Sequence, residues 1–293
     1  MPKENTRYDA VVIGVPTQET SLSPTNAHTT PDAIRQALPR YSLSFVQDGS
    51  ATAWSHRDLT TLTIADAGNI ENPDGDQAGA IAALKDAAAN AGVLIALGGD
   101  NSVTSLVGQA TLGDQMSSAG LITVDAHFDL RDGHSNGSPV RELLDAGLPG
   151  RHIAQVGIAD FANSDMYATR AHDAGITVIP RDALHGHGLD RAVSRALDVA
   201  GAGGGPIHLD IDVDVCDRSV APATPASIPG GLAAWELRLL VRRFATDPRV
   251  VSIDITEIDA TKDTDDERTI RLAALLVLEI LSGMSARGSR ASR

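Results

Sequence analysis

The sequence of 293 residues contains one cysteine and few aromatic residues, which make up 3% of the chain. A single cysteine, Cys216, cannot form a disulfide within the chain. The amino-terminal stretch also lacks an apolar segment of the length that a signal peptide needs. We therefore expect a protein of the reducing cytoplasm.

Basic residues are also scarce, and this limits the class of partner. Lys and Arg total 24 against 38 Asp and Glu, giving a formal net charge of -14. The attraction to phosphate groups that nucleic acids and anionic membranes require is therefore missing. The apolar run at 272–281 is interrupted by Glu279 and is shorter than the roughly 20 residues of a membrane helix. We expect a soluble protein that binds neither nucleic acid nor membranes.

Short β-rich apolar runs alternate with alanine-rich amphipathic stretches along most of the chain. This alternation predicts repeated strand–helix units and an α/β fold with a mainly parallel sheet. The predicted strands cover 10–15, 59–64, 93–97, 121–125, 153–158, 176–180, 206–212 and 249–255. The predicted helices cover 31–37, 76–90, 101–110, 163–174, 189–200, 233–245 and 267–284. We expect one domain over 1–293, because no linker interrupts the interior, with a disordered tail at about 285–293.

Charged side chains cluster at the ends of two predicted strands. Asp125, His127 and Asp129 follow one strand, and Asp210 and Asp212 end another. Residues two apart in an extended chain share a face, and parallel strands bind ligands beyond their carboxyl ends. Carboxylates this close would repel one another without a cation among them. Oxygen ligands with one imidazole favour a hard or borderline divalent ion such as Mn²⁺.

Polar residues also follow two further strands, in the segments 98–102 (GGDNS) and 255–259 (ITEID). A lone Asp at the end of a strand is usually a helix cap or a turn residue. We assign Asp214 and Asp217 to turns on that ground. Clusters at several strand ends instead predict one shared site at the carboxyl edge of the sheet.

The ordered set GGDNS, DAHFD, DIDVD and ITEID resembles the ureohydrolase superfamily of arginase, agmatinase and formimidoylglutamase. The resemblance runs from about Val11 to the last predicted helix. The segments 136–141 (NGSPVR), 156–158 (VGI) and 161–164 (FANS) are most similar to formimidoylglutamases, which hydrolyse N-formimino-glutamate in histidine breakdown. The resemblance implies a three-layer α/β/α sandwich around an eight-stranded parallel sheet. It also implies a homo-oligomer, either a trimer or a hexamer.

The same resemblance implies two Mn²⁺ ions, bridged by Asp125 and Asp210. The implied ligands are Asn101, Asp125, His127, Asp129, Asp210 and Asp212. Asn101 stands where the family has a histidine, and an amide oxygen is the weaker donor. We therefore expect the ion at that position to bind less tightly, or with an extra water. His134 is an alternative ligand there, or else a solvated loop histidine.

The chemistry implied by the resemblance is attack of a metal-bound hydroxide on the C=N carbon of a linear amidine. Asp129 would orient this hydroxide and pass its proton to the leaving amine. Glu257 would hold the planar amidinium group through charge-assisted hydrogen bonds. With N-formimino-L-glutamate as substrate, the products would be L-glutamate and formamide.

Loop residues are expected to select the substrate together with Glu257. Arg131 matches a loop that reads the amino-acid end of the substrate in arginase-like proteins, and a guanidinium suits a carboxylate. Arg141 is a second candidate cation, although either arginine could lie on the surface. Asn136 and Ser138 belong to the same loop. Asn136 replaces a histidine of arginases, which argues against arginase itself.

Three functional hypotheses remain open from the sequence. The chain is a Mn²⁺-dependent formimidoylglutamase, or another ureohydrolase that releases urea from a guanidino acid, agmatine or arginine. Because Asn101 and Asn136 replace two functional histidines, it could instead be a pseudoenzyme that keeps the fold. A deacetylase of related fold would need tandem histidines, and none of the nine histidines are adjacent.

Overall fold

The structure is a computed structural model that describes residues 6–50, 53–185 and 188–287. An eight-stranded sheet runs through it in the order β4-β1-β5-β10-β9-β6-β7-β8. All pairings in this sheet are parallel. Its strands are β1 (Tyr8–Val15), β4 (Ile64–Asn69), β5 (Ala91–Gly98), β6 (Gly120–Val124), β7 (Ile153–Ile158), β8 (Thr177–Pro180), β9 (Ile207–Asp212) and β10 (Val250–Thr256).

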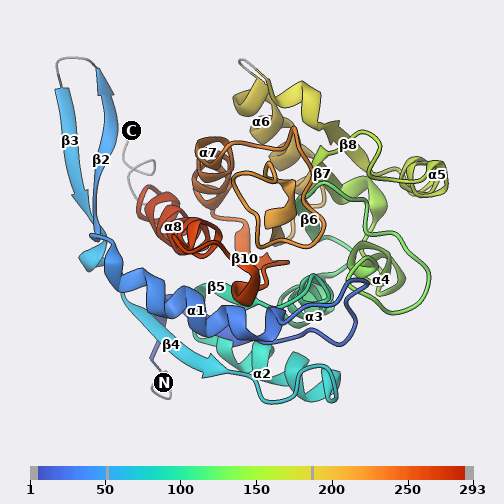
Figure 1. Ribbon diagram of the computed structural model, residues 1–293, viewed down its shortest axis with the longest axis horizontal. Coiled ribbons are helices and arrows are strands. Elements are labelled where there is room, and N and C mark those ends of the chain that lie inside the picture. The colour runs from blue at the N-terminus through green and yellow to red at the C-terminus, as the bar shows by residue number, and fades with distance from the viewer. Residues whose placement is uncertain (1–5, 51–52, 186–187, 288–293) are drawn as a thin grey trace.

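Helices cover both faces of the sheet. They are α1 (Thr30–Ala37), α2 (Gln77–Ala89), α3 (Val103–Leu112), α4 (Pro139–Asp145), α5 (Asp165–Asp173), α6 (Gly188–Ala200), α7 (Ala234–Ala245) and α8 (Arg268–Ser285). One core cluster joins the sheet to α1, α6, α7 and α8, and two others join it to α2, α3, α4 and α5. Figure 1 shows α7 and α8 on one side of β10 and β5, and α2 and α3 on the other. The predicted three-layer α/β/α sandwich is confirmed.

Continuous burial explains why the central strands read as apolar runs. Residues 93–97 of β5 are 0% exposed, as expected for a strand covered on both faces. α7 buries Leu237, Leu240, Val241 and Phe244, whose spacing puts them on one helix face. Burying each of these side chains contributes about 1.5–3 kcal/mol.

The strand order places four strand ends side by side at the middle of the sheet. β5, β10, β9 and β6 are consecutive neighbours, although the chain passes directly from β5 through α3 to β6. Ligands of parallel α/β sheets bind where the chain leaves neighbouring strands in opposite directions. The four polar segments found in the sequence follow these same four strands.

The structure differs from the predicted elements in several places. Leu59–Thr61 forms a 3₁₀ turn, capped by the Asp58 side chain, which accepts from Thr60 N at 2.7 Å. The predicted strand 59–64 is therefore wrong, and β4 begins only at its last residue. Three elements were not predicted, namely α4 and the two strands of an antiparallel hairpin, β2 (Ser44–Ser50) and β3 (Ala53–Asp58). This hairpin projects from the body of the molecule in Figure 1.

The predicted tail begins too early in our sequence analysis. α8 continues to Ser285, and Arg287 donates to the carbonyl oxygens of Ala245 at 2.9 Å and Val250 at 3.0 Å. The rest of the predicted tail, 288–293, lies outside the described residues. Within the described chain, no helix is both long and apolar enough to cross a membrane. The single-domain boundary 1–293 stays a prediction.

Candidate active site

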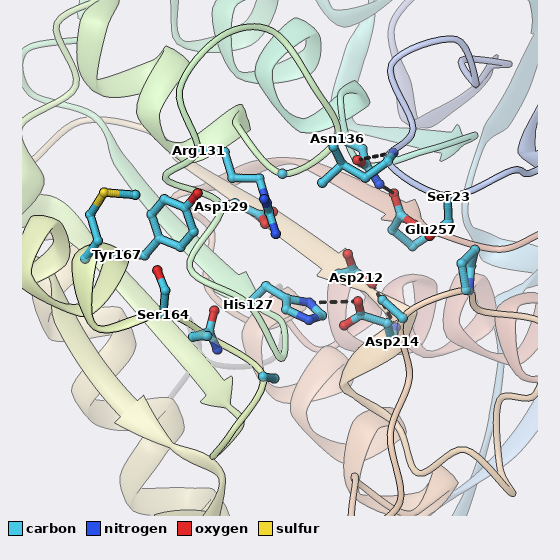
Figure 2. A pocket seen from close by; sticks show the side chains of 17 residues that line it. Ser23, His127, Asp129, Arg131, Asn136, Ser164, Tyr167, Asp212, Asp214 and Glu257 are labelled. Carbon is cyan, nitrogen blue, oxygen red and sulfur yellow. Dashed lines mark hydrogen bonds and ion pairs between the residues drawn. The ribbon is translucent and has the colours of Figure 1, made fainter.

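A cavity of about 500 Å³ lies at the carboxyl edge of the sheet. Its polar lining includes His127, Asp129, Arg131, Asn136, Asp212, Asp214 and Glu257. In Figure 2, Arg131 and Asn136 lie in the upper part of the view, and His127, Asp212 and Asp214 lie below them. Segments of α5 and of the loops at 22–23 and 225–226 complete the wall.

Asp125, His127 and Asp214 form the tightest cluster of potential ligands in the described chain. One donor atom from each lies within 4.8 Å of the others. His127 Nδ1 is 2.9 Å from Asp214 Oδ2 and 3.5 Å from Asp125 Oδ1. Strand β6 ends at Val124, so His127 and the residues after it reach the cavity from a loop and not from the strand itself.

Asp214 is the site residue that our sequence analysis missed. We assigned it to a turn, and it does follow β9 in a 3₁₀ turn, where its N–H donates to Asp212 Oδ1 at 2.8 Å. Its carboxylate, however, is 1% exposed and faces His127. The signal was present, because Asp214 continues the alternation of Asp210 and Asp212. Asp217, by contrast, is a turn residue as predicted, accepting from Ser219 N and Gly230 N.

Asp210, which we predicted to bridge the ions, lies deeper in the sheet than the other acidic residues. It precedes Asp212 by two residues of β9, a distance of about 6.6 Å along a strand. It pairs in register with Thr123 of β6 and Asp254 of β10, and it is absent from the cavity lining. The structure thus places Asp212 and Asp214 on the cavity, and not Asp210, whose role as a bridging ligand stays a prediction from the sequence.

Buried carboxylates without donors show that the cluster fits a cation. Asp125 Oδ2 is buried and has no hydrogen-bond partner among the described residues. Burial, followed by the charge of neighbouring carboxylates, raises the pKa of Asp129 and of Asp212 well above the usual value. A divalent ion would remove this penalty, and carboxylates with one imidazole are the donor set that a hard or borderline ion prefers.

The carboxylates around His127 favour its protonated form. Burial alone would lower the pKa of His127, but the carboxylates of Asp214 and Asp125 outweigh it and raise the pKa to about 12. A metal ion must therefore displace a proton from this imidazole before it can bind there.

Asn101 enters the site through its amide nitrogen. Asn101 Nδ2 donates to Asp129 Oδ2 at 2.6 Å. The amide oxygen accepts from the hydroxyls of Thr104 at 2.8 Å and Thr256 at 2.9 Å. In this orientation the oxygen that we predicted as a ligand points away from Asp129. The alternative ligand His134 instead contacts Glu142 and Gln77 at the surface, as a loop histidine would.

One carboxylate oxygen of Glu257 accepts two hydrogen bonds, and the side chain lines the cavity. Its Oε1 accepts from the backbone N–H of Asn101 and from Nδ2 of Asn136, each at 2.7 Å. Burial, with the Asp100 carboxylate close by, raises the pKa of Glu257 to about 8. A cationic amidinium beside this group would favour its charged form.

Asp129 and Glu257, the two residues predicted to be catalytic, share an uncommon backbone conformation. Their φ angles are +53° and +64°. Left-handed backbone in non-glycine residues costs free energy and clusters at functional sites. Gly99 allows the neighbouring loops to pack closely, because a Cβ there would lie 1.9 Å from the Thr17 carbonyl oxygen.

The four predicted substrate-binding loop residues divide into two groups. Arg131 and Asn136 line the cavity. Ser138 is fully buried and bonds Ser135 at 2.8 Å instead. Arg141 turns back onto its own loop, donating to the carbonyl oxygens of Arg131 and Gly133, each at 2.6 Å. The structure thus brings neither Ser138 nor Arg141 to the cavity.

The acidic cluster at the carboxyl edge of the parallel sheet thus suits a divalent ion, and comparison with known proteins identifies the class as metal-dependent amidine hydrolases. A model of the arginase family matches residues 8–283, and the chain belongs to that family.

Curated relatives cover nearly the whole chain. The formimidoylglutamase of Halalkalibacterium halodurans is 33% identical over 96% of this chain and 89% of its own. That of Bacillus subtilis is 34% identical over 93% and 86%. The crystal structure of the Bacillus subtilis formimidoylglutamase superposes with a TM-score of 0.85 at 29% identity, covering 96% of this chain and 89% of that one. Trypanosoma cruzi formiminoglutamase with Mn²⁺ shares the fold, with a TM-score of 0.83 at 22% identity over 96% and 94%.

Proposed function

We propose that this chain hydrolyses N-formimino-L-glutamate to L-glutamate and formamide, with Mn²⁺ as its metal, in the degradation of histidine. One observation carries the proposal. The Arg131 guanidinium, which has no ion-pair partner among the described residues, lines the same cavity as the acidic cluster and Glu257. The substrate has an amidine at one end and carboxylates elsewhere, so it matches this distribution of charge. The names of the relatives and the manganese in the Trypanosoma cruzi enzyme support the same substrate and metal.

The residues that would hold the metal follow from the geometry of the cluster. We assign them as Asp125, His127, Asp129, Asp212 and Asp214, with Asn101 as a sixth candidate. Asp214 takes the place that we first gave to Asp210. The ions, when bound, would lower the pKa of water toward neutrality and so supply the nucleophile.

Asn101 can join this set by a half-turn of its amide group. The rotated amide would present its oxygen toward Asp129, while its nitrogen donates to the Thr104 and Thr256 hydroxyls, which can accept as well as donate. The rotation preserves both hydroxyl contacts and removes the bond from Nδ2 to Asp129. An amide is a neutral donor, so we expect the ion beside Asn101 to be the more weakly held of two.

The remaining polar groups act on the substrate and its protons. Glu257 would hold the amidinium through Oε2, because its Oε1 is already occupied by Asn101 N and Asn136 Nδ2. Asp129 would accept a proton from the attacking water and deliver it to the leaving nitrogen. Arg131 would bind a carboxylate, which disfavours a cationic substrate such as agmatine. Asn136 cannot shuttle protons, and here it orients Glu257.

Hydrolysis of N-formimino-L-glutamate by Mn²⁺-loaded protein tests the proposal, with formamide and glutamate measured separately. Arginine, agmatine and guanidinobutyrate serve as parallel substrates, and Asp125→Ala as the blank. Formamide from the first substrate alone, abolished in the variant, would support the assignment. Urea from any of the others would favour a different ureohydrolase, and no product from a metal-loaded protein would favour a pseudoenzyme.

We further propose that the protein works in the cytoplasm as a trimer or hexamer of identical chains. The family resemblance carries this part of the proposal. Light scattering on the purified protein would test it, because a monomeric mass at micromolar concentration would contradict it.

A further inference from the structure

Arg131 differs from the two arginines near it, Arg141 on α4 and Arg170 on α5, because its guanidinium forms no ion pair with any described residue. Arg141 and Arg170 both donate to backbone carbonyls and pair with aspartates. For Arg131, the described residues offer its guanidinium no hydrogen-bond acceptor and no ion-pair partner. Its one specific contact is with the ring of Tyr167 on α5, whose centroid lies 5.5 Å from Cζ. Figure 2 shows the two side chains next to each other at the cavity.

The backbone around Arg131 is fastened at successive residues. Arg131 N donates to the Gly137 carbonyl at 3.0 Å, and Arg141 Nε donates to the Arg131 carbonyl at 2.6 Å. On either side, Arg170 donates to the Leu130 carbonyl and to Asp132 Oδ2, each at 2.8 Å. The loop therefore presents the Arg131 side chain from a fixed base.

The side chain lies between a ring and a glycine. A Cβ on Gly137 would lie 2.6 Å from Arg131 Cδ and 3.0 Å from Nε, so a larger residue there would displace the arginine stem from this position. Tyr167 faces the guanidinium from α5, and the same helix carries Arg170, three residues further on. A ring above the plane of a guanidinium leaves its N–H edges free for a carboxylate.

We propose that Tyr167 and Arg170 are positioning residues that hold the Arg131 guanidinium in place to bind a substrate carboxylate. The Tyr167 ring contacts the guanidinium of Arg131 at 5.5 Å and that of Arg170 at 5.7 Å, and Arg170 also holds the residues on either side of Arg131. This inference rests on the proposed function, since it names the residues that make the site selective for anionic amidines. Because the guanidinium is ordered before the substrate arrives, binding the carboxylate costs less conformational entropy.

The test compares Tyr167→Leu and Tyr167→Phe in Mn²⁺-loaded protein. Removing the ring should raise KM for N-formimino-L-glutamate about 5- to 10-fold, the size of a partly desolvated cation–π contact, while kcat changes less than about twofold. Tyr167→Phe keeps a ring and should recover most of the loss. N-propylformamidine, an amidine without a carboxylate, should show no change in kcat/KM. His172→Ala, on the exposed side of α5, is the matched control.

A double-mutant cycle separates positioning from general damage. In an Arg131→Met background, Tyr167→Leu should cause no further rise in KM, because the group that it positions is gone. Arg170→Leu should behave like Tyr167→Leu in the same cycle. Equal losses on both substrates, or full additivity with Arg131→Met, would overturn the proposal.

Binding of L-glutamate, measured by calorimetry, keeps this test independent of turnover. If wild-type protein binds L-glutamate and Tyr167→Leu weakens that binding 5- to 10-fold, the inference stands even where N-formimino-L-glutamate is not hydrolysed. If wild-type protein turns over the substrate but Tyr167→Leu leaves both KM and glutamate affinity unchanged, the inference fails while the proposed function survives.

Discussion

Asp210 on β9 and Asp214 in the turn that follows it should respond differently to the same substitution. Asp214→Asn changes a carboxylate that faces His127 at 2.9 Å on the cavity floor. Asp210→Asn changes a carboxylate two residues before the end of β9, next to Asp254 of β10. Both variants are isosteric, so neither leaves a cavity. The two variants therefore distinguish between two candidate ligands: Asp214, assigned from the structure, and Asp210, assigned from the sequence.

The size of each effect follows from what the carboxylate contacts. Losing a partner that only orients a ligand typically costs 10- to 100-fold in metal affinity, so losing a ligand should cost about 100-fold or more, roughly 2.7 kcal/mol. Asp214→Asn should therefore weaken Mn²⁺ binding by at least that factor. Asp210→Asn should change Mn²⁺ affinity less than about tenfold, because the residue does not reach the cavity.

Stability provides a second and independent readout for Asp210. Neither of its carboxylate oxygens has a hydrogen-bond donor among the described residues. A buried group left without a partner costs about 1–3 kcal/mol, and an amide in its place can donate to Asp254. Asp210→Asn should thus stabilise the metal-free protein by about 1 kcal/mol, which corresponds to about 2 °C in melting temperature.

Calorimetric titration of Mn²⁺ into metal-free protein, with thermal melts of the same samples, measures both quantities. Asp217→Asn is the matched control, because that turn carboxylate lies three residues beyond Asp214 and accepts only local N–H and O–H donors. Loss of Mn²⁺ binding in Asp210→Asn, with normal binding in Asp214→Asn, would refute the structural assignment.

Three further predictions concern the same cavity. Chelation should lower the melting temperature of wild-type protein, because the clustered carboxylates then repel one another, and an unchanged melting curve with EDTA would contradict a shared metal site. Glu257→Gln should reduce kcat/KM about 30- to 1,000-fold, since removing one partner of a buried charge pair costs about 2–4 kcal/mol. Steady-state kinetics measures this loss, and a loss below tenfold would exclude Glu257 as the amidinium partner. Asn101→His should tighten binding of the weaker ion, measured as a lower Mn²⁺ concentration for half-saturation, and an unchanged titration would place Asn101 outside the coordination sphere.

The sequence predicted the layers of the fold well because continuous apolar runs are the direct signature of strands buried on both faces. It failed where local chemistry decides the boundary. Asp58 caps a 3₁₀ turn over Leu59–Thr61 and delays β4, although the residues are as apolar as a strand. The β2–β3 hairpin was not predicted, because apolar and polar residues do not alternate along its strands.

The sequence predicted the site's residue types better than their depth. The family motifs predicted Asp125, His127, Asp129 and Glu257, and the structure brings all four to one cavity or to its floor. Choosing between Asp210 and Asp214 was beyond the pattern, because three alternating aspartates satisfy the same spacing. Only the end of β9 at Asp212 determines which of them reaches past the strand.

The two asparagines that replace family histidines argue against a decayed site when their contacts are considered together. Asn136 Nδ2 and the backbone N–H of Asn101 both donate to Oε1 of Glu257, and no other described residue donates to its Oε2. Asn136 is in turn fixed by Leu22 N, which donates to its Oδ1 at 3.1 Å. In a site without function, we would not expect Glu257 to stay buried in left-handed backbone, with one oxygen hydrogen-bonded and the side chain lining a cavity. Asn136 thus lacks the proton transfer of a histidine and instead orients Glu257, the group that we propose to bind the amidinium of a substrate with charge at both ends.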